Sequence, residues 1–174
     1  MPTTCPKNRP PHLLISLERL RSVLSYNPLT GHLHWLVQMG SRAAAGSRAG
    51  SLGADGYRRV TVDGVHYLEH QLVWFYAHGV WVPELDHENL KRDDNWIDNL
   101  RAATRSQNGA NTHAKSSNKL GIKGVCWHPR NKKFMARISK DRQVTLLGFF
   151  DDPVLAGAAY AKAAQEMFGK FART

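Results

Sequence analysis

One polar segment near residue 115 constrains the fold most, because it divides the chain of 174 residues into two parts. Residues 113–120 (HAKSSNKL) are small and polar and show neither helical nor strand periodicity, which is typical of a linker. Residues 1–115 carry 13 basic and 10 acidic side chains, whereas residues 116–174 carry 11 and 4. We therefore expect two domains, residues 15–112 and 121–174, with a disordered, proline-rich tail at residues 1–14.

The net charge of +10 indicates a polyanionic partner, and nucleic acid is the first to consider. Cys5 and Cys126 are the only cysteines, which is too few for a disulfide framework or a zinc site with paired cysteines. No apolar run reaches the ~20 residues of a membrane helix, and no signal-peptide core is present. We expect a cytoplasmic monomer with no membrane partner and no obligate protein partner.

The first domain is expected to consist of short elements separated by turn signals. Asp63-Gly64 separates two β-prone runs and predicts a tight hairpin. Residues 40–53 are rich in Gly, Ala and Ser and are expected to form a mobile basic loop that buries little. The other expected elements are a helix capped by Ser16, a strand over residues 33–37, hairpin strands over residues 57–62 and 65–68, and a helix over residues 71–78.

An acidic island lies within this basic chain. Six of its 14 acidic residues fall between Glu84 and Asp98, and they would repel a phosphate backbone unless a divalent cation lay between. Carboxylate and amide oxygens suit a hard cation such as Mg²⁺. Adjacent Asp86 and His87 would point to opposite faces of a regular strand, so they can serve one site only at a bend or strand end.

A helix is predicted shortly after this island. Residues 104–107 (TRSQ) have the form of a capping box, so the helix should begin at Arg105 and carry Asn108 near its first turn. The order DH-x(11)-N-L-R-x-x-T-x-x-x-N, from Asp86 to Asn108, resembles the HNH (His-Me finger) endonucleases of phages and mobile introns. The resemblance extends from about Tyr26 to Asn111. It implies a ββα-metal unit, in which two strands and a helix frame one catalytic Mg²⁺ or Mn²⁺.

The resemblance also implies roles for individual residues. His87 would be the general base that deprotonates water, and Asn99 would orient the loop that carries His87. Asp86 and Asn108 would hold the metal. The family commonly has His at the last position. Asn108 is a weaker, neutral ligand, so we expect the turnover rate to be low or to depend on a higher metal concentration. His70 matches a histidine frequent in the family, but packing at a helix start explains it equally well.

Residues 121–174 predict a sheet covered by one helix. The β-prone runs are residues 121–127, 134–139 and 143–150, and a helix over residues 154–168 follows the cap signal Asp152-Pro153. Alternation in the middle run places Phe134, Ala136 and Ile138 under the helix. The expected fold class is therefore α+β, with a ββα-metal nuclease domain followed by a three-stranded antiparallel sheet packed on one helix.

The second domain resembles the DNA-binding domain of ethylene-response factors, whose exposed sheet face enters the major groove. The resemblance rests on residues 123–125 (KGV), Trp127, 134–138 (FMARI), 147–150 (LGFF), 158–160 (AAY) and 168–169 (FG). It implies outward positions for Lys123, His128, Arg130, Arg137 and Ser139, flanked by Lys132, Lys133, Lys140 and Arg142. Lys132 and Lys133 are expected to contact phosphate and Arg137 a base edge.

Together these features predict a metal-dependent endonuclease acting on double-stranded DNA, with site choice aided by the C-terminal module. The alternative is a DNA-binding transcriptional regulator with a degenerate nuclease centre, for which Asn108 is the only support.

Overall fold

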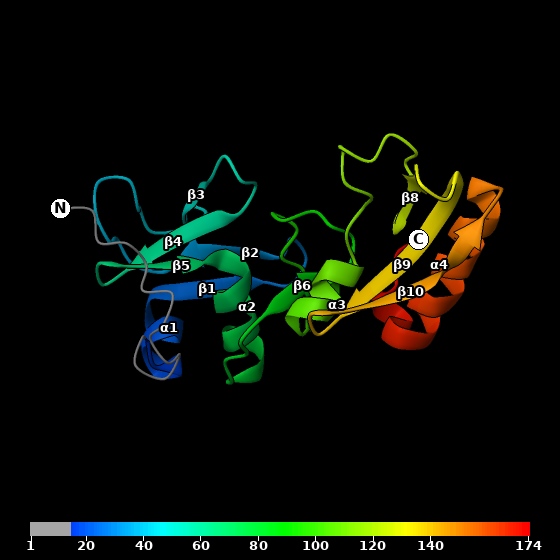
Figure 1. Cartoon of the computed structure of the whole chain (residues 1–174). Helices are drawn as coiled ribbons and strands as arrows, with labels where there is room; N and C mark the ends of the chain where they lie inside the picture. The colour runs from blue at the N-terminus through cyan, green and yellow to red at the C-terminus, as the bar shows by residue number, and fades with distance from the viewer. Residues whose placement is uncertain (1–14) are drawn as a thin grey trace. The chain divides into compact units, whose positions relative to one another are not determined.

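A computed structural model of the chain describes residues 15–174, so the predicted tail at residues 1–14 lies outside the described residues. The chain forms two compact units that divide between Ala102 and Ala103 (Figure 1). We call residues 15–102 the N-terminal unit and residues 103–174 the C-terminal unit. No helix among the described residues is long and apolar enough to cross a membrane.

The N-terminal unit is built from short elements, as the turn signals predicted. Its helices are α1 (Leu17–Val23), α2 (Glu69–His78) and the 3₁₀ turn η2 (Ile97–Asn99). Its strands form the hairpin β1 (Leu24–Asn27) with β2 (His32–Trp35), the antiparallel sheet β3 (Ser51–Leu52), β4 (Arg58–Val62) and β5 (Val65–Leu68), and the antiparallel pair β6 (Leu85–His87) with β7 (Leu100–Ala102).

Local signals in this unit are confirmed. The Ser16 hydroxyl accepts a hydrogen bond from the Arg19 N–H and caps α1. Asp63 and Gly64 take φ values of 50° and 76° and form the two-residue turn between β4 and β5. Gly79 ends α2 with a φ of 69°, although the helix begins at Glu69, two positions earlier than predicted.

The segment predicted as a mobile basic loop forms backbone hydrogen bonds with β2. The Ala49 N–H donates to the Leu33 carbonyl at 2.7 Å, and the Ser47 carbonyl accepts from the Trp35 N–H at 3.0 Å. The Ala49 side chain is fully buried in the core cluster. Ala49 is the one buried residue of this segment, and most of the others are exposed, so the prediction that residues 40–53 bury little is confirmed. The burial of Ala49 itself was not predicted, because backbone pairing with β2 is not visible in composition.

The C-terminal unit contains the predicted sheet and helix. Its elements are α3 (Arg105–Ala110), β8 (Val125–His128), β9 (Lys133–Lys140), β10 (Gln143–Phe150), α4 (Pro153–Phe168) and the 3₁₀ turn η3 (Gly169–Phe171). The antiparallel strand order is β10-β9-β8, and α4 packs on one face (Figure 1). Ala136 and Ile138 are buried beneath α4, as the alternation predicted.

One glycine allows the close approach of α4 to the sheet. Gly124 has a φ of 73°, and a Cβ there would lie 2.1 Å from Cδ2 of the Tyr160 ring. Any side chain at this position would therefore force the helix away from the sheet.

Helix α3 packs within the C-terminal unit. Ala110 is buried in a cluster that includes Tyr160 and Phe168, and its carbonyl accepts from the Arg173 N–H at 3.2 Å. The compact units thus divide ahead of residues 113–120, the segment predicted as the linker. That segment has no helix or strand.

Candidate active site

The hairpin of β6 and β7 positions the two residues at the centre of the motif. Asp86 lies opposite Arg101 and His87 lies opposite Leu100 on the neighbouring strand. His87 is the last residue of β6, as the requirement for a strand end predicted. The side chains are buried, and Oδ2 of Asp86 accepts hydrogen bonds from Nε of Arg101 at 2.8 Å and lies 2.8 Å from its Nη2.

The His87 imidazole has a defined tautomer. Its Nε2 lies 2.9 Å from Oδ1 of Asn95, while Nδ2 of Asn95 donates to Oε2 of Glu69 at 2.7 Å. Because the Asn95 amide group is directed at the carboxylate, its oxygen faces the ring and accepts from Nε2–H. The neutral imidazole therefore carries its lone pair on Nδ1. Burial lowers the pKa of His87, opposed by the Asn95 bond and the Asp86 charge.

The carboxylate behind Asn95 is fully buried and firmly held. Oε1 of Glu69 accepts from the Leu33 N–H at 3.1 Å, and Oε2 lies 3.3 Å from Arg48 and 3.6 Å from Arg58. Both arginines also contact Asp93, at 3.2 and 3.0 Å. Burial raises the pKa of Glu69, whereas the Leu33 bond and the guanidinium groups lower it. This network fixes the Asn95 amide and, through it, the His87 ring.

His70 lies against the same imidazole. Its ring centroid is 5.0 Å from that of His87 in an edge-on arrangement and 5.3 Å from that of Tyr57. Burial, with a smaller contribution from His87, lowers the pKa of His70 to about 3, so the ring is neutral near pH 7. On the same helix the ring centroid of Trp74 lies 4.1 Å from that of His78.

Asn99 holds both ends of the loop that follows His87. Its Oδ1 accepts from the Asn89 N–H at 3.0 Å, and its Nδ2 donates to the Asp94 carbonyl at 2.7 Å. Its backbone carbonyl accepts from the Glu88 N–H at 2.9 Å. Asn99 thus occupies the position required of a residue that orients this loop.

Asn108 lies on α3, whose start was predicted correctly. The Thr104 hydroxyl accepts from the Gln107 N–H, and the Gln107 side chain accepts from the Thr104 N–H, which completes the capping box. Asn108 stands in the first turns of the helix, and its N–H donates to the Thr104 carbonyl at 2.9 Å.

The oxygen donors of the motif fit a hard cation. An ionised carboxylate offers about four acceptor positions, so the bonds of Asp86 to Arg101 do not by themselves exclude a metal. Within residues 15–174 there is no group of three or more His, Cys, Asp or Glu side chains suited to a metal. Carboxylate and amide oxygens are donors of the kind that Mg²⁺ accepts, with its remaining ligands from water and substrate phosphate. Asp86 belongs to the N-terminal unit and Asn108 to the C-terminal unit.

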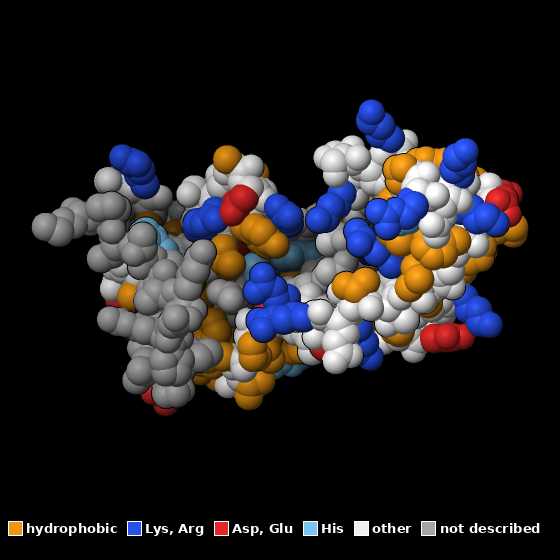
Figure 2. All heavy atoms as spheres, in the orientation of Figure 1, with side chains coloured by type: hydrophobic (Ala, Val, Ile, Leu, Met, Phe, Trp, Pro, Cys, Tyr) orange, Lys and Arg blue, Asp and Glu red, His pale blue; other side chains and the backbone are white. Residues whose placement is uncertain are grey.

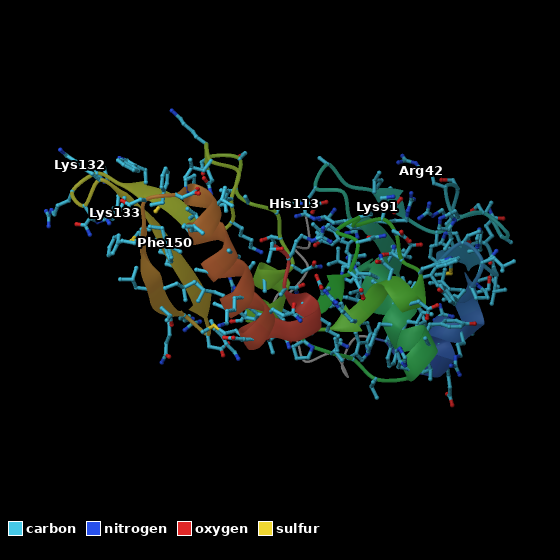
Figure 3. All side chains as sticks on the ribbon, turned by 90° about the vertical axis from the view of Figure 1, so that its right-hand side faces the viewer. Arg42, Lys91, His113, Lys132, Lys133 and Phe150 are labelled. Carbon is cyan, nitrogen blue, oxygen red and sulfur yellow. The ribbon has the colours of Figure 1, made fainter. Side chains whose placement is uncertain are left out.

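The residues predicted to bind DNA lie at several places on the C-terminal unit. Arg137 is exposed on the sheet face opposite α4, together with Ser139. Figure 3 shows Lys132 and Lys133 at the outer end of the β8–β9 hairpin, where Lys133 pairs with Asp151 at 3.0 Å. Arg130 and Arg142 are exposed, and Nδ1 of the half-buried His128 accepts from the Asn131 N–H. Figure 2 shows Lys and Arg side chains among hydrophobic ones over this unit.

Two residues of the predicted DNA-binding set donate to backbone carbonyls of the fold. Nζ of Lys123 donates to the carbonyls of Gly109, Ala110 and Thr112 at the end of α3, and burial lowers the pKa of Lys123 to about 8. Lys140 donates to the Met167 carbonyl on the helix side of the sheet. The outward placement of Lys123 was wrong because β8 begins only at Val125, so strand alternation does not reach it.

Sequence reasoning missed the network behind His87. Asn95 lies inside the acidic island and Glu69 directly precedes His70, but neither position carries a spacing signal that marks it. A polar residue on the buried face of a predicted helix is the only available hint for Glu69.

Comparison with known proteins supports the motif. Residues 67–110 match the family model described as HNH endonuclease, which points to nuclease activity. The match contains Asp86, His87, Asn99 and Asn108. No curated protein and no solved structure matches the chain.

Proposed function

We propose that this chain is a divalent-cation-dependent endonuclease that hydrolyses phosphodiester bonds in double-stranded DNA, with site choice aided by residues 121–174. The observation that carries the proposal is the His87 ring, which closes a strand inside the matched segment and is held by Asn95 in one tautomer. A histidine fixed in this way is suited to acid–base work rather than to packing alone.

In the proposed reaction His87 is the general base. Its depressed pKa keeps the imidazole neutral near pH 7, and Nδ1 accepts a proton from the attacking water. The resulting imidazolium donates from Nε2 to Asn95, while the neighbouring Asp86 carboxylate favours its charge. Asn99 keeps the loop in place during this transfer through its bonds to Asn89 and Asp94. The expected products end in a 5′-phosphate and a 3′-hydroxyl.

Asp86 and Asn108 would hold one Mg²⁺ or Mn²⁺. When bound, such a cation stabilises the negative charge that develops on the scissile phosphate and the leaving oxygen. Arg101 holds the Asp86 carboxylate in position with two short contacts. Because the Asn108 amide oxygen is a weaker ligand than the histidine common at this position, we expect a higher metal requirement.

The outer sheet face of the C-terminal unit is proposed to bind DNA. Arg137 stands on this face beside exposed Leu146 on the neighbouring strand, so a guanidinium and apolar contacts are presented together. Lys132 and Lys133 are expected to contact phosphate. The remaining residues of the proposed DNA-binding set are His128, Arg130 and Arg142. Lys123 and Lys140 are not included in this proposal, because their ammonium groups donate to backbone carbonyls of the same unit.

The test is a nicking assay on supercoiled plasmid. Purified protein with Mg²⁺ or Mn²⁺ should convert the plasmid to nicked or linear forms, and His87→Ala should abolish the conversion. His66→Ala is the matched control, because His66 is an exposed histidine of the same unit outside the motif. DNA binding without nicking in either cation would instead favour a regulator with a degenerate centre.

A further inference from the structure

A large groove lies in the C-terminal unit, apart from the motif histidine. One wall is formed by α3 and residues 112–120, and the other by β8, β9 and the start of β10. Its volume is about 1570 Å³. Small-molecule sites usually measure ~300–1,000 Å³, so the groove is large enough for a segment of a polymer.

Positive charge is concentrated on both walls of this groove. Five exposed cationic side chains line it: Arg105, Lys115, Lys119, Arg137 and Arg142. Within the described part of the chain, none of these five side chains has a hydrogen bond or ion pair. Asp141 is the single acidic residue among the lining residues, and its carboxylate accepts from the Ser106 hydroxyl at 2.8 Å. A groove lined by cationic side chains attracts an anionic ligand.

The walls are held in place before any ligand binds. Nδ2 of Asn118 donates to the carbonyls of Ile122 and Val125 at 2.7 and 3.2 Å, which fixes the segment predicted as a linker to the start of β8. The Lys123 ammonium joins the end of α3 to the same region through the Thr112 carbonyl at 2.7 Å. A groove fixed in this way loses less conformational entropy when it binds a partner.

Apolar side chains complete the lining. Trp127 and Val144 are 49% and 63% exposed, and Leu120 is 37% exposed. In protein–DNA interfaces Lys and Arg contact the phosphates, and apolar side chains pack against base edges such as the thymine methyl group. We propose that this groove binds the backbone of one strand of a DNA duplex, with Arg105, Lys115 and Lys119 opposite Arg137 and Arg142. The inference rests on the proposed function, because it takes DNA as the substrate.

The segment that was predicted to be a passive linker therefore has a function of its own. Lys115 and Lys119 would contact phosphates of the strand whose bases face the sheet. The DNA interface would then include both the sheet and the polar segment that precedes it.

The test compares the salt dependence of DNA binding between matched variants of the full chain. Lys115→Gln/Lys119→Gln removes two groove charges, whereas Arg42→Gln/Lys162→Gln removes two exposed charges elsewhere. Binding to a fluorescent DNA duplex is measured by anisotropy at several salt concentrations. Each lost phosphate contact should make the slope of log affinity against log salt shallower by about 0.9, so the groove variant should differ by about 1.8 and the control by far less.

A second pair, Arg105→Gln/Arg142→Gln, takes one charge from each wall and should reproduce the effect. If the wild type binds and nicks DNA but both groove variants have the same salt slope as the wild type, the proposal that the groove binds DNA is wrong. The nuclease proposal would still stand in that case. A wild type that neither binds nor nicks DNA overturns both proposals. Tighter binding of an RNA duplex of the same sequence overturns the assignment to DNA.

Discussion

Acid should destabilise the N-terminal unit through His70, and a single substitution isolates the effect. The His70 side chain is only 6% exposed and packs against the Tyr57 and His87 rings. His70→Phe keeps an aromatic ring in this place and removes the titrating group. The variant should therefore lose part of the acid sensitivity of the wild type while retaining the packing.

The magnitude follows from the two pKa values of His70. Its pKa is about 3 in the folded chain and ~6.5 in an unfolded one, so unfolding takes up a proton between these values. Because the folded-state pKa is depressed, the unfolded state binds more protons, and stability falls as pH decreases from 6.5 toward 3. The largest slope is about 1.4 kcal/mol per pH unit, and the total is at most about 5 kcal/mol. Many domains have a total stability of only ~5–15 kcal/mol.

Urea unfolding of wild type and His70→Phe at pH 7, 6, 5 and 4.5 measures this effect directly. The stability of the variant relative to wild type should rise by about 1 kcal/mol per pH unit below pH 6. His66→Phe is the control, because His66 is exposed and its ring bonds the Thr61 hydroxyl at the surface. If wild type and His70→Phe lose stability in parallel as pH falls, the His70 ring is not held neutral by burial and the reasoning fails.

Two further substitutions test the contacts of the site and of α3. Asn95→Ala removes the bond that raises the pKa of His87, so the acid limb of the pH–rate profile for nicking should move to lower pH. The nicking rate should fall about 10–100-fold. If neither the rate nor the acid limb of the pH–rate profile changes, Asn95 does not position His87. Lys123→Met removes the donor to the last carbonyls of α3 and should lower the free energy of unfolding by about 2 kcal/mol. The exposed Lys119→Met should leave that free energy nearly unchanged, and equal effects would show that the Lys123 bonds contribute nothing.

The sequence predicted those parts of the fold that depend on neighbouring residues. The Asp63-Gly64 turn and the capping box at Thr104 were found because a few adjacent residues determine the backbone there. The same holds for Asp152, whose carboxylate accepts from the Val154 N–H at the start of α4. The motif residues were found for a similar reason, since their spacing is a property of the chain and not of its packing.

Long-range contacts were not predictable in this way. Asn95 and Glu69 are 26 positions apart, and only the packing of α2 brings the Glu69 carboxylate to the amide. The burial of Ala49 depends on pairing with β2, which composition does not reveal. Helix α3 was assigned to the first domain because it lies before the polar segment. In the structure it belongs to the C-terminal unit, because Ala110 packs in one cluster with Phe168.

The packing of α3 also determines which experiments can separate DNA binding from cleavage. Deleting residues 121–174 would remove the ammonium of Lys123 and the ring of Phe168, which hold the end of the helix that carries Asn108. Loss of cleavage by such a deletion would follow whether or not the sheet binds DNA. Substitutions at exposed positions such as Arg137 and Lys115 leave the contacts of α3 intact. Only these substitutions can therefore assign a loss of cleavage to weakened DNA binding.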